Sequence, residues 1–261
     1  MAGTWNEAPM NEAAPTIRAV ERAIDVLRCF TAAAPTLSVT DLQRELGLSR
    51  PVLYRLLHTL EGRGLIRSFG EPQRFELAHG VLELAQGWLG GNEVAVAAKP
   101  YLTALWNETD ETVALSIPAG EREKLVVEEL RSRQALMFTR GAGLTEDVAI
   151  GASGKAILAF YAAAALERAL DGRPDRRTLE RSLAMFRTDG FGVSTGEVIE
   201  GAISIAAPIF NASGEIAGSV SLFGPEARIR GDRRENFVEA VRKAGREISE
   251  ALGYRETLAA E

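Results

Sequence analysis

Four polar side chains recur at helical spacing within residues 49–60, SRPVLYRLLHTL, and they are Arg50, Tyr54, Arg55 and His58. Arginine commonly reads guanine in the major groove of DNA and also binds phosphate. The leucines of the same segment recur at i, i+3 and i+4, which predicts a buried face opposite these side chains. The segment therefore predicts a short helix with one polar face suited to duplex DNA.

Local signals upstream of this helix predict how it is positioned. Ser49 can cap it with its hydroxyl, and Pro51 suits its first turn. Ser38 and Asp41 form a capping box for a preceding helix, and Gly47 stands where the chain must turn. Two short capped helices joined by a glycine-containing turn predict a helix-turn-helix.

A hairpin is predicted directly after the second helix. Leu65 and Ile66 favour a short strand, residues 70–72 favour a turn, and Phe75 and Leu77 alternate in a second strand. Such a hairpin beside a helix-turn-helix forms a wing.

The predicted DNA-facing region is basic, whereas the chain is acidic. Residues 44–74 contain six Arg and three Glu, a local balance of 6 − 3 = +3, while the chain total is −6. A small basic surface is sufficient for phosphate binding. An arginine-rich helix alone is usually only a solvated face, so DNA binding is favoured by the ordered set of helices, turn and hairpin.

Length and composition favour a globular protein of one large or two modest domains, since the chain has 261 residues, 46% hydrophobic and 25% charged. No apolar stretch approaches 18 residues, so no membrane span is predicted. Residues 1–16 lack a signal-peptide pattern and are expected to form a disordered tail. These features predict a cytoplasmic protein.

Cysteine and histidine are too few for several kinds of site. The chain has one cysteine, Cys29, and two histidines, His58 and His79, which excludes an internal disulfide and a His/Cys zinc site. A Ser-His-Asp triad would have to recruit His58 from the DNA-facing helix. We therefore expect no metal, no cofactor and no catalytic residues, and we expect Cys29 to be a small buried hydrophobic residue.

Helical periodicity is evident on both sides of the predicted DNA-binding region. A helix over residues 18–33 should pack on the helix-turn-helix through Val20, Ala23, Ile24, Leu27 and Phe30. Residues 80–91 predict a connecting helix, and Asn92 can cap a further helix that continues to about residue 107.

The remainder of the chain mixes strands and helices, which favours an α+β sensor-like domain. Helices are expected after residue 150, over 178–189 and over 232–252, and strands over 113–117, 124–130, 135–138, 203–210 and 216–223.

A glycine-rich turn, residues 151–155, is the most suggestive feature of this part. It departs from a Walker A loop at Ala149 and Ala156, and from a nucleophile elbow at Lys155. Two interpretations remain: backbone N–H groups at a helix start could hold a carboxylate, or the glycines could simply permit a tight turn. Ser204 and Ser221 in the apolar strands could likewise bind a ligand, or bond to backbone or water.

As a set, these residues resemble the IclR (isocitrate lyase regulator) type of bacterial transcriptional regulators. The resemblance is carried, in order, by RAVERAIDVLRCF, LSVTDLQRELGLSRPVLYRLLHTLEGRGLI, GASGKAILA, ISIAAPIF and SLFGPEARI. It implies a winged helix-turn-helix over 17–79, a linker helix over 80–91 and a GAF-like effector-binding domain over 92–256. It further implies a homodimer or dimer of dimers on a palindromic operator, and a small-molecule effector that is an organic or aromatic acid.

The resemblance also implies site residues. DNA contacts fall to Arg50, Pro51, Val52, Tyr54 and Arg55, with wing support from Arg67 and Arg74. The effector pocket would be lined by Phe138, Ala152, Ser153, Ser194, Ala202, Ser204, Ser221 and Phe223. The family often has a hydroxyl residue in place of Val52 and a cysteine in place of Ser204, and some members have an acid in place of Ser194.

The expected function is therefore a sequence-specific, effector-controlled transcriptional regulator without catalytic activity. One alternative is a small-molecule enzyme that uses Lys155 or Glu200 as its base. Another is a protein-interaction module in which the winged domain binds a protein.

Overall fold

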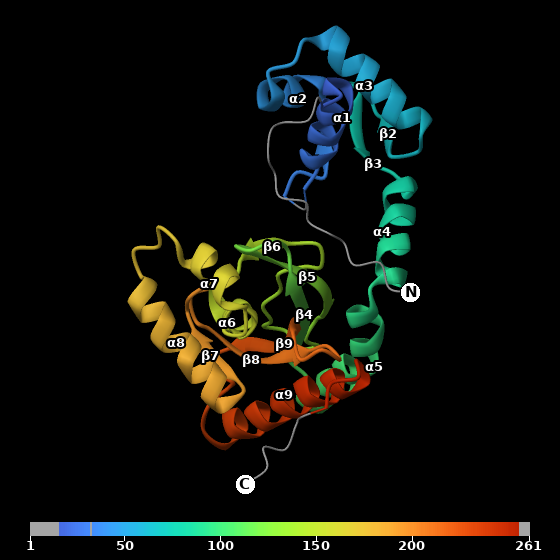
Figure 1. Ribbon diagram of the computed structural model, residues 1–261. Helices are drawn as coiled ribbons and strands as arrows, with labels where there is room; N and C mark the ends of the chain where they lie inside the picture. The colour runs from blue at the N-terminus through green and yellow to red at the C-terminus, as the bar shows by residue number, and fades with distance from the viewer. Residues whose placement is uncertain (1–15, 32, 256–261) are drawn as a thin grey trace. The chain divides into compact units, whose positions relative to one another are not determined.

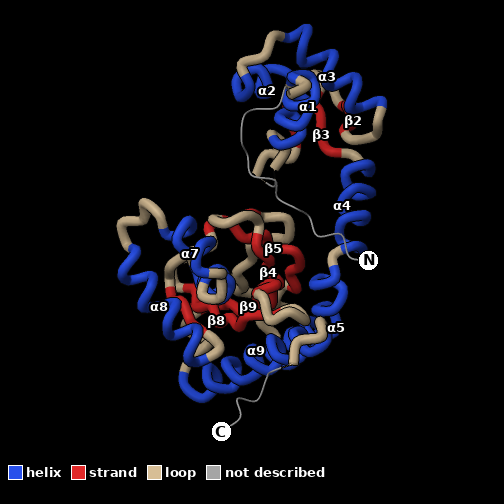
Figure 2. Tube along the Cα trace, in the orientation of Figure 1, coloured by secondary structure: helices blue, strands red, loops and turns tan. Residues whose placement is uncertain are grey.

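The computed structural model describes residues 16–31 and 33–255 of the chain. The chain divides into two compact units, and the boundary between them lies between Trp88 and Leu89. This position is inside the segment expected as a linker helix. Apart from residue 16, the tail expected to be disordered lies outside the described residues. Each unit is described separately, and Figures 1 and 2 show the elements of both.

The first unit is a winged helix-turn-helix. Its three-stranded antiparallel sheet has the order β1-β3-β2. Its elements are α1 (Arg18–Arg28), β1 (Thr36–Leu37), α2 (Val39–Leu46), α3 (Arg50–Gly62), β2 (Ile66–Phe69) and β3 (Arg74–Leu77).

The predicted caps are mostly confirmed. Ser38 and Asp41 form the reciprocal capping box, in which the Asp41 N–H donates to Ser38 Oγ over 3.2 Å and the Ser38 N–H donates to Asp41 Oδ2 over 3.0 Å. Gly47 adopts a left-handed conformation, with φ of 65°, that ends α2. Ser49 occupies the N-cap position of α3, but its hydroxyl makes no capping hydrogen bond, so that expected contact is wrong.

Helix α1 differs from the prediction in length and in the face that it buries. It ends at Arg28 rather than continuing to residue 33. Val20 and Ile24 are 52% and 44% exposed, whereas Val26, not included in the expected stripe, is fully buried. The other three predicted residues, Ala23, Leu27 and Phe30, lie with Val26 in or against the core, so the predicted stripe is partly confirmed. Cys29, which directly follows the last residue of α1, is half-buried, whereas it was expected to be buried.

The second unit is a six-stranded antiparallel sheet with helices on both faces. The strand order is β6-β5-β4-β9-β8-β7. Helix α4 (His79–Gly91) leads into it, and the remaining elements are α5 (Glu93–Thr109), β4 (Thr112–Pro118), β5 (Glu123–Leu130), β6 (Thr145–Asp147), α6 (Gly151–Leu158), α7 (Ala163–Leu170), α8 (Arg176–Asp189), β7 (Gly192–Thr195), β8 (Ala202–Phe210), β9 (Ile216–Pro225) and α9 (Gly231–Ala251). The predicted α+β class is confirmed.

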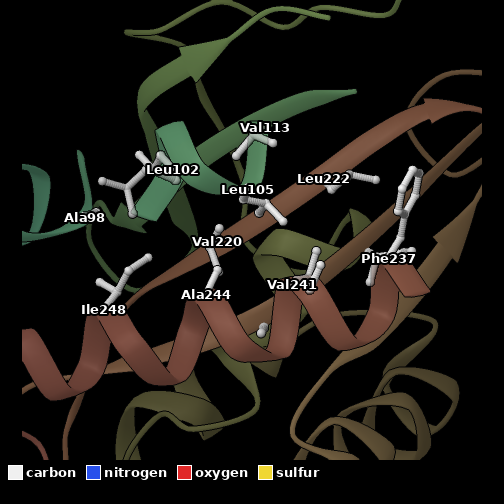
Figure 3. Packing of buried hydrophobic residues seen from close by; sticks show 14 of the residues in the cluster. Ala98, Leu102, Leu105, Val113, Val220, Leu222, Phe237, Val241, Ala244 and Ile248 are labelled. Carbon is white, nitrogen blue, oxygen red and sulfur yellow. The ribbon is translucent and has the colours of Figure 1, made fainter. Parts of the chain in front are cut away.

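Helices α5 and α9 cover one face of this sheet. Figure 3 shows side chains of α9 such as Val241 directed toward α5 and toward strand residues that include Val220 and Leu222. The opposite face packs on α6, where Ala156 joins a buried cluster with Ala206 of β8. Helix α6 therefore packs directly on this second face of the sheet.

The strand expected at residues 135–138 is wrong, since the third strand of this part is β6. Side-chain hydrogen bonds hold the intervening segment in place of a backbone ladder. Thr112 Oγ1 donates to the Phe138 carbonyl over 2.8 Å, and the Glu129 carboxylate accepts the N–H of Arg140 over 2.7 Å. Strand β7 was not expected either, and the single helix expected after residue 150 is two helices, α6 and α7.

No helix in the described ranges is both long enough and apolar enough to cross a membrane.

Candidate functional site

The polar face predicted for α3 is present. Arg50, Tyr54, Arg55 and His58 are exposed on it, and so is Pro51. The opposite face is buried through Leu53, Leu57 and Leu60. Val52 is half-buried beside the exposed face, so only part of its side chain is open to a partner.

The two arginines of α3 differ in how they are held. Arg50 lies 3.4 Å from both Gln43 Oε1 and Thr40 Oγ1, at the long limit of a hydrogen bond. Arg55 makes no side-chain hydrogen bond or ion pair within the described ranges. Both guanidinium groups are therefore available to donate hydrogen bonds to a nucleic acid. Arg55 would lose no internal contact on doing so.

The wing arginines are less free than those of α3. Arg67 is exposed and pairs across the hairpin with Glu76, Nε to Oε1 over 2.5 Å. Arg74 is half-buried, and its Nη2 donates to the Thr36 carbonyl over 2.8 Å while Nε bonds to Thr36 Oγ1. Arg74 thereby ties β3 to β1, which leaves mainly Nη1 for a phosphate.

A small cavity of about 60 Å³ lies between the sheet of the second unit and the start of α6. Seven of the eight residues expected in an effector pocket line it, namely Ala152, Ser153, Ser194, Ala202, Ser204, Ser221 and Phe223. The eighth, Phe138, does not line it but packs behind Phe223.

Strand register explains why residues far apart in the chain meet here. Ser194 of β7 pairs with Ser204 of β8, which in turn pairs with Phe223 of β9. Ser221 pairs with Ala114 of β4. Paired residues in an antiparallel sheet share a face, so the register places these side chains on the face that carries the cavity.

The N-terminus of α6 already holds an acid from the chain itself. The Gly151 N–H donates to Glu197 Oε2 over 3.1 Å, and the Ala152 N–H donates to Ser194 Oγ over 3.0 Å. Lys155 Nζ lies 2.6 Å from both carboxylate oxygens of Glu197.

The tight-turn interpretation of this segment also applies. A Cβ on Gly154 would lie 2.3 Å from the Val148 carbonyl oxygen, so only glycine fits there. Backbone donors at a helix start and a close backbone approach therefore coexist in residues 151–155.

Four charged residues of the cavity were missed by the sequence analysis: Lys124, Arg140, Glu146 and Glu197. Lys124 and Glu146 are directly paired across β5 and β6. Lys124 stands directly before the apolar residues Leu125 and Val126. A lysine in that position usually lies at the solvated end of a strand, so the sequence did not indicate that it lines a cavity.

Burial, and next to it the charge of Arg140, lower the pKa of Lys124 to about 8. Because this value lies above neutral pH, the ammonium form still predominates there. In the described part of the chain, no group of three or more His, Cys, Asp or Glu side chains could hold a metal ion.

Comparisons with known proteins identify both units. The IclR helix-turn-helix domain matches residues 19–68, and the C-terminal domain of bacterial IclR transcriptional regulators matches residues 86–250. The chain belongs to the IclR family of bacterial transcriptional regulators. Members of this family have a helix-turn-helix DNA-binding domain and a C-terminal effector domain.

Individual IclR proteins support the assignment. The regulator XynR of Escherichia coli K12 is 30% identical over 250 residues, covering 92% of this chain and 99% of XynR. An IclR regulator from Alicyclobacillus acidocaldarius has the same fold, with a TM-score of 0.81, 21% identity, and coverage of 92% and 100% of the two chains. An IclR homologue from Microbacterium hydrocarbonoxydans complexed with 4-hydroxybenzoate gives a TM-score of 0.79, 22% identity, and coverage of 90% and 98%.

The enzyme alternative loses its two candidate bases in this IclR chain. Lys155 is engaged with Glu197 and does not line the cavity. Glu200 is exposed and also lies outside the lining. The regulatory function is therefore favoured over the enzymatic one.

Proposed function

We propose that α3 reads a half-site of an operator. Arg50 and Arg55 contact base edges or phosphates from its polar face, Pro51, Val52 and Tyr54 provide the adjoining surface, and Arg67 and Arg74 support the duplex backbone from the wing. The observation that carries this proposal is the exposed face of α3, whose arginines have weak internal contacts or none. This geometry suits a helix entering the major groove.

The proposed regulator binds a palindromic operator as a homodimer or a dimer of dimers. Support comes from exposed apolar side chains in the first unit, Val20 and Ile24 on α1 and Leu82 and Leu84 on α4. Val20 and Ile24 are one helical turn apart on the same face of α1, and a contiguous exposed apolar patch commonly marks an interface. We place the protein in the cytoplasm, where it has access to DNA.

The second unit is proposed to sense a small organic acid in its cavity. Predicted lining residues beside the start of α6 provide hydroxyl groups for its oxygens. The bound 4-hydroxybenzoate of the Microbacterium homologue supports an acid of some kind. The volume of about 60 Å³ favours a small acid.

The proposal is tested with the full chain and labelled duplexes from the region beside its own gene, followed by fluorescence anisotropy. One duplex should bind about 10³-fold or more tightly than an unrelated duplex of equal length. Small organic acids should then change that affinity. Equal affinity for all duplexes would contradict the DNA-reading role, and chemical conversion of an added acid would support the enzyme alternative instead.

A further inference from the structure

One end of the cavity in the second unit carries a charge cluster that the proposed function does not use. Lys124 Nζ lies 2.5 Å from Glu146 Oε2, and Arg140 Nη2 pairs with the other oxygen of the same carboxylate. All three residues line the cavity. Two cations therefore share one carboxylate, and this end of the lining has a net charge of 2 − 1 = +1.

Lys124 has more donors than acceptors. The residue is only 3% exposed, yet its ammonium makes a single hydrogen bond, to Glu146, within the part of the chain that the structure describes. An ammonium has three N–H donors, and a buried cation is costly unless its donors are paired. The acceptors for the remaining N–H groups have to come from whatever fills the cavity.

Other nearby carboxylates are already engaged. Glu129, behind Arg140, accepts the backbone N–H groups of Arg140 and Gly141 over 2.7 and 2.9 Å. Glu197, at the α6 end, is paired with Lys155. Glu129 therefore offsets part of the charge of Arg140 from outside the lining, whereas neither Glu129 nor Glu197 hydrogen-bonds to Lys124 in the described ranges.

The opposite end of the cavity is rich in hydroxyl groups, and the one carboxylate there, Glu197, is paired with Lys155. Ser153, Ser194 and Ser204 line it, beside the start of α6. In the described ranges, the Ser204 hydroxyl makes no hydrogen bond of its own. The cavity thus has two polar ends with different chemistry, a charged one on β5 and β6 and a hydroxyl-rich one on β7, β8 and α6.

We propose that the effector is a small dicarboxylate with one carboxylate at each end. One binds the serine hydroxyls near α6, and the second binds Lys124 and Arg140. Charge-assisted hydrogen bonds to a buried ammonium and guanidinium are stronger than neutral ones, so the second carboxylate should add affinity. This inference rests on the proposed acid-sensing function of the same cavity, and it adds the class of acid.

The experiment is isothermal titration of the full chain with acids matched in carbon number: malonate against propionate, succinate against butyrate, and glutarate against pentanoate. In at least one pair the dicarboxylate should bind about tenfold or more tightly than the monocarboxylate. This comparison uses the unmodified protein, so it does not depend on the folding of a variant.

Two variants then test the cluster with opposite expected signs. Lys124→Met should reduce the affinity for the dicarboxylate about tenfold. The ratio of dicarboxylate affinity to monocarboxylate affinity should then approach one. Glu146→Gln removes the internal carboxylate that competes for both cations, so it should raise the affinity severalfold at a pH below neutral, where Lys124 stays charged in the variant. Lys99→Met, an exposed α5 residue outside the lining, makes the same charge change as Lys124→Met and should have no effect.

Monocarboxylates that bind as tightly as their matched dicarboxylates would overturn this inference and leave the cavity as an acid site. Failure of every acid to bind would overturn both this inference and the acid-sensing proposal. DNA binding by the same preparation reports separately on the helix-turn-helix.

Discussion

Arg55 is the side chain on which the DNA-reading proposal can be tested most directly, because it is exposed and has no internal partner in the described ranges. If it is bidentate to guanine, Arg55→Ala should reduce operator affinity by about 1–3 kcal/mol. If it contacts only phosphate, the loss of affinity should be smaller. The slope of log affinity against log salt concentration should then become shallower by about one.

Anisotropy titrations at several salt concentrations separate these two cases. Arg234→Ala, in the exposed first turn of α9, is the matched control and should bind the operator normally. Normal binding by the Arg55 variant would mean that another face of the first unit contacts DNA.

The titration of Lys124 predicts a pH dependence of effector binding. Its pKa is lowered to about 8, mainly by burial, and the charged groups facing it are Glu146 from β6 and Arg140 from the preceding segment. Below that pH the ammonium is charged and can bind the second carboxylate, and above it the charge is lost. Dicarboxylate affinity should therefore be constant at neutral pH and fall as the pH rises beyond about 8.

The measurement is calorimetric titration from pH 6.5 to 9.5, a range of roughly three units that spans the charged and neutral forms of Lys124. Lys124→Met should abolish the decline. A decline of equal size in that variant would assign the pH dependence to another group.

At the scale of elements, two glycines in helices predict opposite effects on stability. Alanine at position 154 would place Cβ 2.3 Å from the Val148 carbonyl, whereas a Cβ on Gly87 in α4 meets nothing within 4 Å. Gly154→Ala should therefore destabilise the second unit by about 1–3 kcal/mol. Gly87→Ala should stabilise α4 by about 0.5–1 kcal/mol, because glycine loses more conformational entropy in a helix.

Thermal denaturation of both variants checks these signs. Gly154→Ala should also weaken acid binding, because the start of α6 borders the cavity. A melting temperature unchanged by Gly154→Ala would show that the turn before α6 can shift without cost.

The elements also show which predictions could be made locally. The capping box of α2 and the wing hairpin depend on residues within a few positions of one another, and both are present. The strand expected at 135–138 depended on which segment pairs with β5, and β6 takes that place. An apolar tetrapeptide does not encode its pairing partner.

At the scale of the whole molecule, the proposed homodimer can be tested through α1. Val20 and Ile24 are exposed apolar residues of that helix. Replacing both with Glu should weaken self-association, because a buried carboxylate without a partner is costly. Operator affinity should fall with it, since a dimer contacts two half-sites.

Light scattering after size-exclusion chromatography gives the mass in solution. Met185→Glu, at an exposed apolar position of α8, introduces the same group outside the proposed interface and should leave the mass unchanged. If the unmodified chain is a monomer, or if the double variant keeps its dimeric mass, the interface lies elsewhere or does not form.

The sequence by itself determined the helix-turn-helix, the wing, the α+β class and the family, because caps, turn glycines and apolar periodicity act over a few residues. It also supplied the serines and small residues that line the cavity. Tertiary structure decided the rest: which apolar residues of α1 are buried, that Phe138 packs behind the lining, and that Lys124 meets Glu146, 22 positions away. Those outcomes depend on strand register and packing, which join segments whose local patterns contain no information about each other.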